Sequence, residues 1–182
     1  MAQTLNASHS SSSGDKESLT EKASTGKHAG RPDTTIGHVG LTARNPAASA
    51  EFYRNVFGME ITGGSTSDHP IGATAFLTSR PGGQPHDLVL AANPEVAHVA
   101  FKVSSLAELK SFHARVVEMK IPLKFVFNHH ESFAFYFNDP DGNMIEVCWP
   151  TGDLSGRQPY VEPVDLSKSD DELLELLAQK PA

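Results

Sequence analysis

Two histidines and one glutamate are the residues of this chain whose types and spacing point most directly to chemistry. His38 opens the phrase His-Val-Gly-Leu, and sixty positions later His98 opens the related phrase His-Val-Ala-Phe. Glu146 lies between two β-branched residues in a third apolar segment. Imidazole and carboxylate groups in this combination are ligands for divalent transition metals. The repeat therefore predicts a metal site built from matching positions of a duplicated module.

The alternation of side chains along a strand explains how these residues would share a site. Successive residues point to opposite faces, so His38 shares a face with Gly40, and His98 shares one with Ala100. Each small residue leaves space beside an imidazole for a metal or a ligand. Glu146 faces away from its apolar neighbours, and burial of a carboxylate is costly unless it is paired or metal-bound.

The elements that must position these residues follow the same order in both copies: a strand, a capped helix and three more strands. The first helix is expected to begin at Asn45-Pro46, an N-cap followed by an N1 proline, and to end at Gly58. A capping box from Ser105 to Glu108 predicts the start of the second helix. The strands are expected at 36–43, 59–62, 73–78 and 87–91, and then at 97–103, 123–127, 133–138 and 144–149.

The apolar faces of the two helices are expected to pack against these strands. A spacing of three and four residues places them on one side of each helix. In the first helix this face contains Ala50, Tyr53, Val56 and Phe57, and in the second it contains Leu109, Phe112, Val116 and Met119. Tyr53 and Phe57 are therefore predicted to be core residues.

The two ends of the chain differ from this repeated region. Residues 1–33 are rich in Ser, Thr, Gly and Lys and hold almost no large apolar residues, so we expect a disordered N-terminal tail. Residues 151–182 are expected to be an extended C-terminal tail with a short helix at 170–179, capped by Ser169. The sequence leaves open whether this tail packs on its own domain or on a second subunit.

Composition excludes several classes of partner. The net charge of −7 and the isoelectric point near 5.7 argue against nucleic acid and against an anionic membrane surface. No apolar run approaches the roughly 20 residues that cross a bilayer, and the N-terminus lacks the apolar region of a signal peptide. Cys148 is the single cysteine, which precludes an intrachain disulfide and fits a reducing compartment. We therefore expect a cytoplasmic protein.

These motifs as a set resemble the vicinal oxygen chelate superfamily, which includes glyoxalases, fosfomycin-resistance enzymes, bleomycin-binding proteins and extradiol dioxygenases. The segments that carry the resemblance are 36–41, 51–59, 98–101 and 138–146, and it covers residues 34–150. The resemblance implies an α+β fold of paired βαβββ modules, 34–92 and 95–150, that form an open, cup-shaped mixed sheet around a metal site. His38, His98 and Glu146 would be the metal ligands, with open positions for two vicinal oxygens of a small-molecule substrate.

Within this superfamily the chain is most similar to single-domain catechol 2,3-dioxygenase-like proteins. Tyr136 lies ten residues before Glu146, and in extradiol dioxygenases a tyrosine at that spacing hydrogen-bonds the catecholate. His129 and His130 precede this tyrosine, and the resemblance implies that one of them is an acid–base group, with a slight preference for His130. His86 lies in a stretch that is similar to one before the fourth strand of many extradiol enzymes, where it is expected to support the metal ligands or the structure and not to bind the metal itself.

The resulting prediction is an Fe(II) extradiol dioxygenase that cleaves a catecholic substrate. Mn(II), Ni(II) and Zn(II) suit similar ligands, and a homodimer is common among such folds. One alternative is a glyoxalase-like lyase or isomerase, for which only Asp87 would serve as a fourth ligand. A fosfomycin-type transferase has the same three ligands, but no Lys/Arg-rich loop is evident. A metal-free drug-binding protein of the bleomycin-resistance type is the remaining alternative.

Overall fold

A computed structural model describes residues 33–82, 85–152 and 159–178 of the chain. The first module contains β1 (Thr35–Thr42), α2 (Pro46–Phe57), β2 (Glu60–Ser65), β3 (Thr74–Thr78) and β4 (Leu88–Ala91). The second contains β5 (Val99–Lys102), α3 (Leu106–Glu118), β6 (Leu123–Asn128), β7 (Ser132–Asn138) and β8 (Met144–Pro150), and is followed by β9 (Glu162–Pro163) and α4 (Asp170–Ala178). The predicted α+β class is confirmed, whereas the predicted N-terminal tail lies outside the described residues apart from Asp33.

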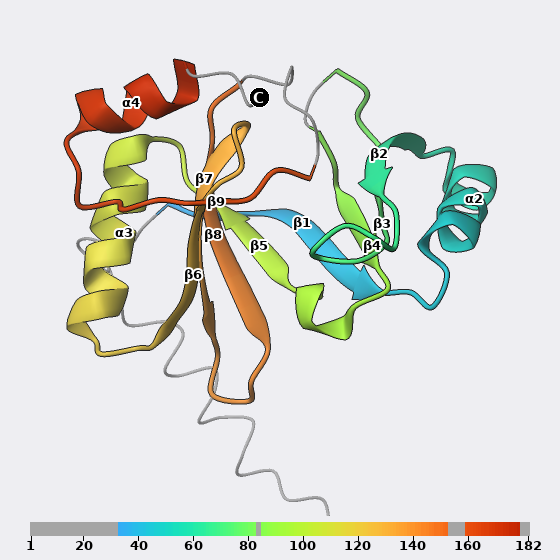
Figure 1. The fold of residues 1–182 in the computed structure, drawn as a ribbon, viewed down its shortest axis with the longest axis horizontal. Coiled ribbons are helices and arrows are strands. Elements are labelled where there is room, and N and C mark those ends of the chain that lie inside the picture. The colour runs from blue at the N-terminus through green and yellow to red at the C-terminus, as the bar shows by residue number, and fades with distance from the viewer. Residues whose placement is uncertain (1–32, 83–84, 153–158, 179–182) are drawn as a thin grey trace, which may run out of the picture. The chain divides into compact units, whose positions relative to one another are not determined.

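The nine strands form one mixed sheet in the order β2-β3-β4-β1-β5-β8-β7-β6-β9 (Figure 1). In each module the first strand pairs in parallel with the last, β1 with β4 and β5 with β8. The modules join through the antiparallel pair of β1 and β5, where His38 lies opposite Ala100. Gly40 exchanges backbone hydrogen bonds with His98, at 2.7 and 3.3 Å. The two histidine phrases therefore meet at the centre of the sheet in a symmetric register.

The helices of both modules begin as their capping residues predict. The side chain of Asn45 accepts a hydrogen bond from the Ala48 amide at 3.1 Å, and Ser105 accepts one from the Glu108 amide at 3.2 Å. Gly58 ends α2 with a φ of +69°, a left-handed conformation that favours glycine. None of the helices in the described ranges is long and apolar enough to cross a membrane.

The start of the second module differs from the expectation. A strand was expected from residue 97, but β5 begins at Val99, because residues Pro94–Val96 form a 3-10 turn that is capped by Asn93. His98 therefore lies directly before β5, where it is still held by its backbone bonds to Gly40.

Each module has its own apolar core on the helix-bearing face of the sheet. Figure 1 shows α2 beside β2–β4 and α3 beside β6–β8. Ala50 and the partly buried Tyr53 pack in the first core, as predicted. Phe57 is wrongly predicted as core, since it is 65% exposed, and Val56 on the same predicted apolar face is 58% exposed. Phe57 is the last residue of α2 and stacks on Tyr53, beyond the part of the helix that meets the sheet.

The second core is closed by the C-terminal segment of the same chain. Its fully buried residues include Leu109, Phe133, Phe135 and Leu173. Met119 is wrongly predicted to belong to this core: it caps the C-terminus of α3 and is 63% exposed.

The C-terminal helix is fixed to the second module by side-chain packing and by polar contacts. Ser169 and Glu172 form a reciprocal capping box at its start. The ammonium group of Lys110 in α3 contacts the Asp170 carboxylate at 2.6 Å. The short strand β9 pairs with β6. The sequence left open whether the tail packs on its own domain or on a second subunit. The described part of the tail packs on its own domain.

Replacement of Leu173 by alanine tests this packing. The side chain is fully buried among residues of α3 and the sheet, so we expect its truncation to lower the free energy of unfolding by about 2–4 kcal/mol. The adjacent Leu174 is 46% exposed, and its replacement by alanine is expected to cost less than about 0.5 kcal/mol. Urea unfolding of both variants measures the difference, and equal effects would contradict the packing of α4 on the domain.

Candidate functional site

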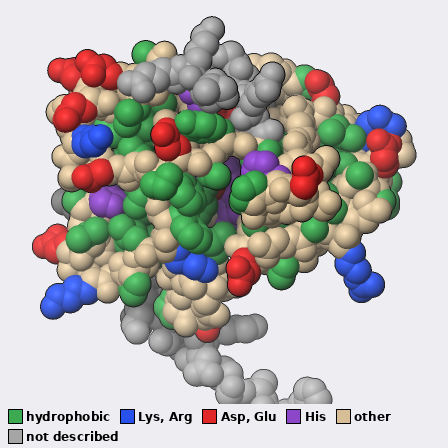
Figure 2. All heavy atoms as spheres, viewed as in Figure 1, with side chains coloured by type: hydrophobic (Ala, Val, Ile, Leu, Met, Phe, Trp, Pro, Cys, Tyr) green, Lys and Arg blue, Asp and Glu red, His purple; other side chains and the backbone are tan. Residues whose placement is uncertain are grey.

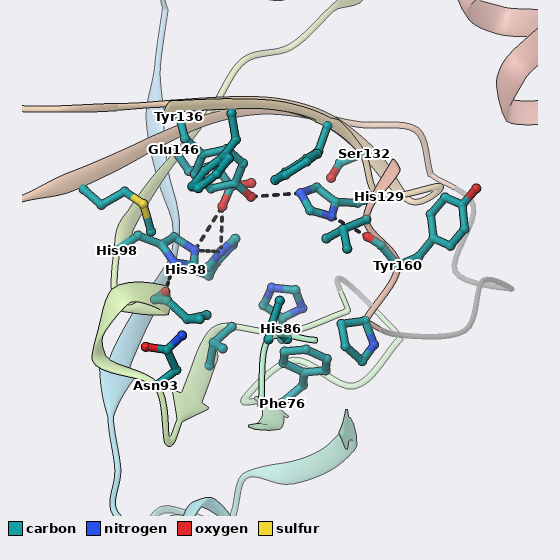
Figure 3. A pocket seen from close by; sticks show the side chains of 18 of the residues that line it. His38, Phe76, His86, Asn93, His98, His129, Ser132, Tyr136, Glu146 and Tyr160 are labelled. Carbon is teal, nitrogen blue, oxygen red and sulfur yellow. Dashed lines mark hydrogen bonds and ion pairs between the residues drawn. The ribbon is translucent and has the colours of Figure 1, made fainter. Parts of the chain in front are cut away.

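His38, His98 and Glu146 converge on one point of the sheet (Figure 3). The Nε2 atoms of His38 and His98 are 2.8 Å apart, and they lie 3.3 and 3.0 Å from the same oxygen of Glu146. Two donor atoms that are bound at right angles about 2.1 Å from one metal ion would be separated by about 3.0 Å. The donor set therefore fits one divalent ion with two imidazoles and one carboxylate in adjacent positions.

The surroundings of His98 orient its ring for ligation. Its Nδ1 lies 2.6 Å from the carbonyl oxygen of Val96, to which Nδ1–H donates, so Nε2 is the atom directed at the cluster and its lone pair would be the one offered to a metal. A Cβ atom on Gly40 would lie 3.0 Å from this Nδ1. A larger residue than Gly40 would therefore crowd this imidazole, in agreement with the small residue that the sequence pattern singled out.

Glu146 is available as an ionised ligand. Its side chain is buried, and burial by itself raises the pKa of a carboxyl group. The charges and hydrogen bonds of His38 and His98 outweigh burial and hold the pKa of Glu146 well below its ordinary value. The carboxylate is therefore charged at neutral pH.

The first module supplies no equivalent carboxylate. Val89 in β4 pairs with Gly40 of β1 in the same register in which Glu146 of β8 pairs with Ala100 of β5. Asp87, the one residue considered as a fourth ligand, is ion-paired with Arg80 and accepts hydrogen bonds from Ser79. The described cluster therefore has three protein donors.

A histidine–tyrosine pair lies beside the cluster. The Nε2 atom of His129 is 2.9 Å from the hydroxyl of Tyr136, and its Nδ1 atom is 2.6 Å from the carbonyl oxygen of Tyr160. A carbonyl only accepts, so Nδ1–H donates to Tyr160 and the tyrosine O–H donates to Nε2. Burial lowers the pKa of His129, whereas burial and the nearby Glu146 raise the pKa of Tyr136 well above its ordinary value. At neutral pH the pair is a neutral imidazole and a protonated phenol.

The structure places His129, and not His130, in the pocket. His130 is at the tip of the β6–β7 hairpin with a φ of +66°, and its amide donates to the Asn128 side chain at 2.7 Å. The His130 side chain is buried, its ring lies 6.2 Å from that of Tyr160, and it is not among the residues that line the pocket. The sequence slightly favoured His130 as the acid–base group, but the histidine that contacts Tyr136 is His129.

Three residues of the pocket, His86, Glu131 and Tyr160, were not predicted to be site residues. The ring of His86 lies 4.4 Å from that of His38 and stacks on Phe76 at 5.1 Å. Burial, aided by the charge of His38, lowers the pKa of His86 to about 3, so the ring is neutral. The motif around His86 was visible in the sequence, which predicted a supporting or structural role for this residue and not ligation of the metal. Glu131 and Tyr160 had no sequence signal, because distant pairing brings them to the site.

These residues line a cavity of about 280 Å³ between the two halves of the sheet. Figure 2 shows histidine side chains (purple) in a hollow that hydrophobic side chains (green) border. Its wall contains the three candidate metal ligands and, in addition, His86, His129 and Tyr136. The remaining wall is mostly apolar, and a concave apolar pocket with a few convergent polar groups is typical of small-molecule sites.

Glu131 gives this region a testable pH dependence. Burial and the nearby Glu146 raise its pKa from 4.5 to about 8. Because the folded-state pKa is the higher one, the folded protein keeps this proton while the unfolded chain loses it, and stability falls as the pH rises from about 4.5 to 8. In metal-free protein the free energy of unfolding should therefore decrease by about 2–4 kcal/mol less over this pH range in Glu131→Gln than in the wild type.

Urea unfolding at a series of pH values measures this effect. Glu118→Gln, at an exposed carboxylate at the end of α3, is the control and should leave the pH profile unchanged. Parallel profiles for the wild type and Glu131→Gln would show that Glu131 does not hold a proton in the folded state.

Comparison with known proteins agrees with this geometry. Residues 35–147 match the model of the Glyoxalase/Bleomycin resistance protein/Dioxygenase superfamily, and the chain belongs to this superfamily. It is 32% identical over 126 residues to a catechol-2,3-dioxygenase of Bacillus subtilis, which covers 63% of this chain and 41% of that protein. It is 29% identical over 133 residues to the metallothiol transferase FosB of Shouchella clausii, which covers 70% of this chain and 86% of that protein.

The solved structures agree in fold. The 2,2',3-trihydroxybiphenyl 1,2-dioxygenase of Sphingomonas wittichii superposes with a TM-score of 0.59 at 19% identity, over 71% of this chain and 50% of that one. The predicted vicinal oxygen chelate fold is thereby confirmed. The chain spans less than half of the catechol dioxygenase relative and half of this structural neighbour.

Proposed function

We propose that this protein is an Fe(II)-dependent extradiol dioxygenase that opens the ring of a catecholic substrate. The observation that carries the proposal is the His129–Tyr136 pair, which lies against the His38/His98/Glu146 cluster in the wall of an apolar cavity. The ring of His98 is 5.9 Å from that of Tyr136, so a substrate beside the cluster would also meet the phenol. The similarity to a catechol-2,3-dioxygenase supports the same reaction class.

The three ligands would hold the metal and leave positions for a chelating substrate. Bound Fe(II) would supply Lewis-acid binding of the two vicinal oxygens and activation of dioxygen. Mn(II), Ni(II) and Zn(II) fit the same donors, so the preference for iron follows from the proposed reaction. The apolar wall would exclude water from the ring.

The protein side chains would manage the protons of the substrate. Tyr136 holds its proton at neutral pH, and its single O–H, which donates to His129 in this structure, would turn to donate to a substrate oxygen. His129 has an unprotonated Nε2 atom and can accept a proton there, while the Tyr160 carbonyl stabilises the resulting imidazolium through Nδ1–H. His86 is a neutral imidazole in the same cavity, and its pKa of about 3 makes it a weak base, so its role would be to form hydrogen bonds or contacts.

The alternative reactions have less support in the site. A fosfomycin-type transfer requires recognition of a phosphonate, yet no Lys or Arg occurs among the described residues that line the cavity. A glyoxalase I-type centre uses a fourth protein ligand, and Val89 stands at the matching position. A metal-free drug-binding module would not need the close convergence of two imidazoles on one carboxylate.

The decisive experiment is oxygen uptake by protein that has been reconstituted anaerobically with Fe(II) and then given catechols and air. The expected result is uptake of one dioxygen per catechol with a yellow ring-fission product, absent from protein loaded with Zn(II). No uptake by protein with stoichiometric iron would refute the proposal, and assays of thiol transfer and of isomerisation would then follow. Sedimentation velocity tests the predicted homodimer independently.

A further inference from the structure

The two modules give the cavity two walls that are related by the duplication but differ in chemistry. In the second module Tyr136 of β7 pairs with Glu146 of β8. At the matching register of the first module, Phe76 of β3 pairs with Val89 of β4. The phenol and carboxylate of one wall are thus replaced by a phenyl and an isopropyl group in the other. Both apolar side chains are nearly fully buried and line the cavity.

The apolar character extends beyond this pair. Ile71 comes from the loop between β2 and β3, Val96 from the turn before β5, and Val161 from the C-terminal segment. Two phenylalanines of β6, Phe125 and Phe127, stack on each other at 5.2 Å on the side of the second module. A substrate group that projects away from the reactive residues therefore meets hydrocarbon from several elements.

The charges of the wall disfavour an anionic group. The described residues of the lining include no Lys or Arg, and their carboxyl groups besides Glu146 are those of Glu95 and of Glu131, which keeps its proton at neutral pH. A carboxylate on the substrate would lose its hydration without gaining a cationic partner, and this is costly in an apolar cavity. The pocket thus selects against charge in the part of the substrate that does not react.

The volume of the cavity limits the size of the non-reacting part of the substrate. An engineered cavity of about 150 Å³ holds a benzene molecule. The cavity here is about 280 Å³, which accommodates one aromatic ring together with an apolar group of similar size.

We propose that the substrate is a catechol with an uncharged, apolar substituent that packs against Phe76 and Val89. This inference rests on the proposed extradiol function and adds the substrate class to it. The substituent would be an alkyl or aryl group no larger than about one ring. Phe76, Val89 and Ile71 are the residues that determine this specificity.

Anaerobic calorimetric titration of the Fe(II)-loaded protein tests the proposal without requiring turnover. The probes are catechol, methylcatechol, ethylcatechol, propylcatechol and dihydroxybenzoate. We expect the affinity to rise about threefold to fourfold with each added methylene group. Dihydroxybenzoate should bind at least about 30-fold more weakly than methylcatechol. A flat alkyl series, or equal binding of the carboxylate, would overturn the proposal.

Two variants locate the substituent. Ile71→Lys places a cation at the apolar wall and should raise the affinity for dihydroxybenzoate relative to propylcatechol by about tenfold or more. The matched control is Ile61→Lys on the partly exposed edge strand β2, outside the cavity lining, which should leave the ratio unchanged. Val89→Ala enlarges the cavity beside this wall and should shift the binding preference toward longer alkyl groups. If both pocket variants leave the ranking unchanged, the substituent does not lie against this wall.

Oxygen uptake with the same panel separates this inference from the proposed function. If the catechols bind anaerobically in the expected order of affinity but cause no oxygen uptake, the proposed dioxygenase function is refuted and the preference for apolar ligands is supported. Ring cleavage with a preference for the carboxylated catechol would support the dioxygenase and overturn the substrate class.

Discussion

Replacement of Glu146 by glutamine is expected to weaken metal binding by more than about 100-fold, because loss of a supporting residue around a metal ligand already costs about 10–100-fold. The substitution retains the size of the side chain but removes the negative charge that the two imidazoles now share. It also removes the group that compensates for the positive charge of a buried ion. Metal content after dialysis, followed by competitive titration with a chromophoric chelator, measures the loss.

Glu131→Gln is the matched control for this experiment. Glu131 is another buried carboxyl group in the wall of the same cavity, but it lies outside the three-residue cluster. We expect this variant to retain metal affinity within about threefold. If Glu146→Gln binds Fe(II) as tightly as the control does, Glu146 is not a ligand and the metal site must be sought elsewhere.

Replacement of Tyr136 by phenylalanine is expected to lower kcat/KM for the catechol by about 100-fold or more while metal content stays at the wild-type level. The ring remains and keeps its contacts with Phe125 and Phe127, so the cavity should retain its shape. The hydroxyl that donates to His129, and that would face the substrate oxygen, is lost. Steady-state oxygen uptake together with iron analysis separates the loss of turnover from a loss of metal.

The control for this change is Tyr53→Phe. Tyr53 is a partly buried tyrosine in α2 that packs in the core of the first module and does not line the cavity. Its replacement should leave kcat/KM unchanged. Unaltered turnover by Tyr136→Phe would remove the phenol from the reaction and leave His129 as the proton carrier.

Local chemistry made a large part of this structure predictable from sequence. Asn45, Gly58 and Ser105 mark helix ends because their side chains or backbone satisfy groups only a few residues away. The strand alternation around His38 and His98 is likewise local, and the duplication relates the two positions. The sequence could therefore predict the α+β class, the paired modules and the three residues that the structure brings together.

Other features depended on contacts between distant parts of the chain. The choice between His129 and His130 was decided by a left-handed hairpin residue and by the carbonyl of Tyr160, which lies 31 positions beyond His129. The exposure of Phe57 depends on where α2 leaves the sheet, which helical periodicity does not reveal. The sequence of the C-terminal helix does not reveal which apolar surface it packs against, and the structure shows that this surface is formed with α3.

Sequence thus determined which residue types recur with which period, because hydrogen bonds and side-chain alternation act over a few residues. Only the tertiary structure decided which wall of the cavity is polar. Both walls are built from strands with the same pattern, but Tyr136 and Glu146 meet in one module and Phe76 and Val89 meet in the other. That difference becomes a binding preference only when strand pairing places all four side chains around one cavity.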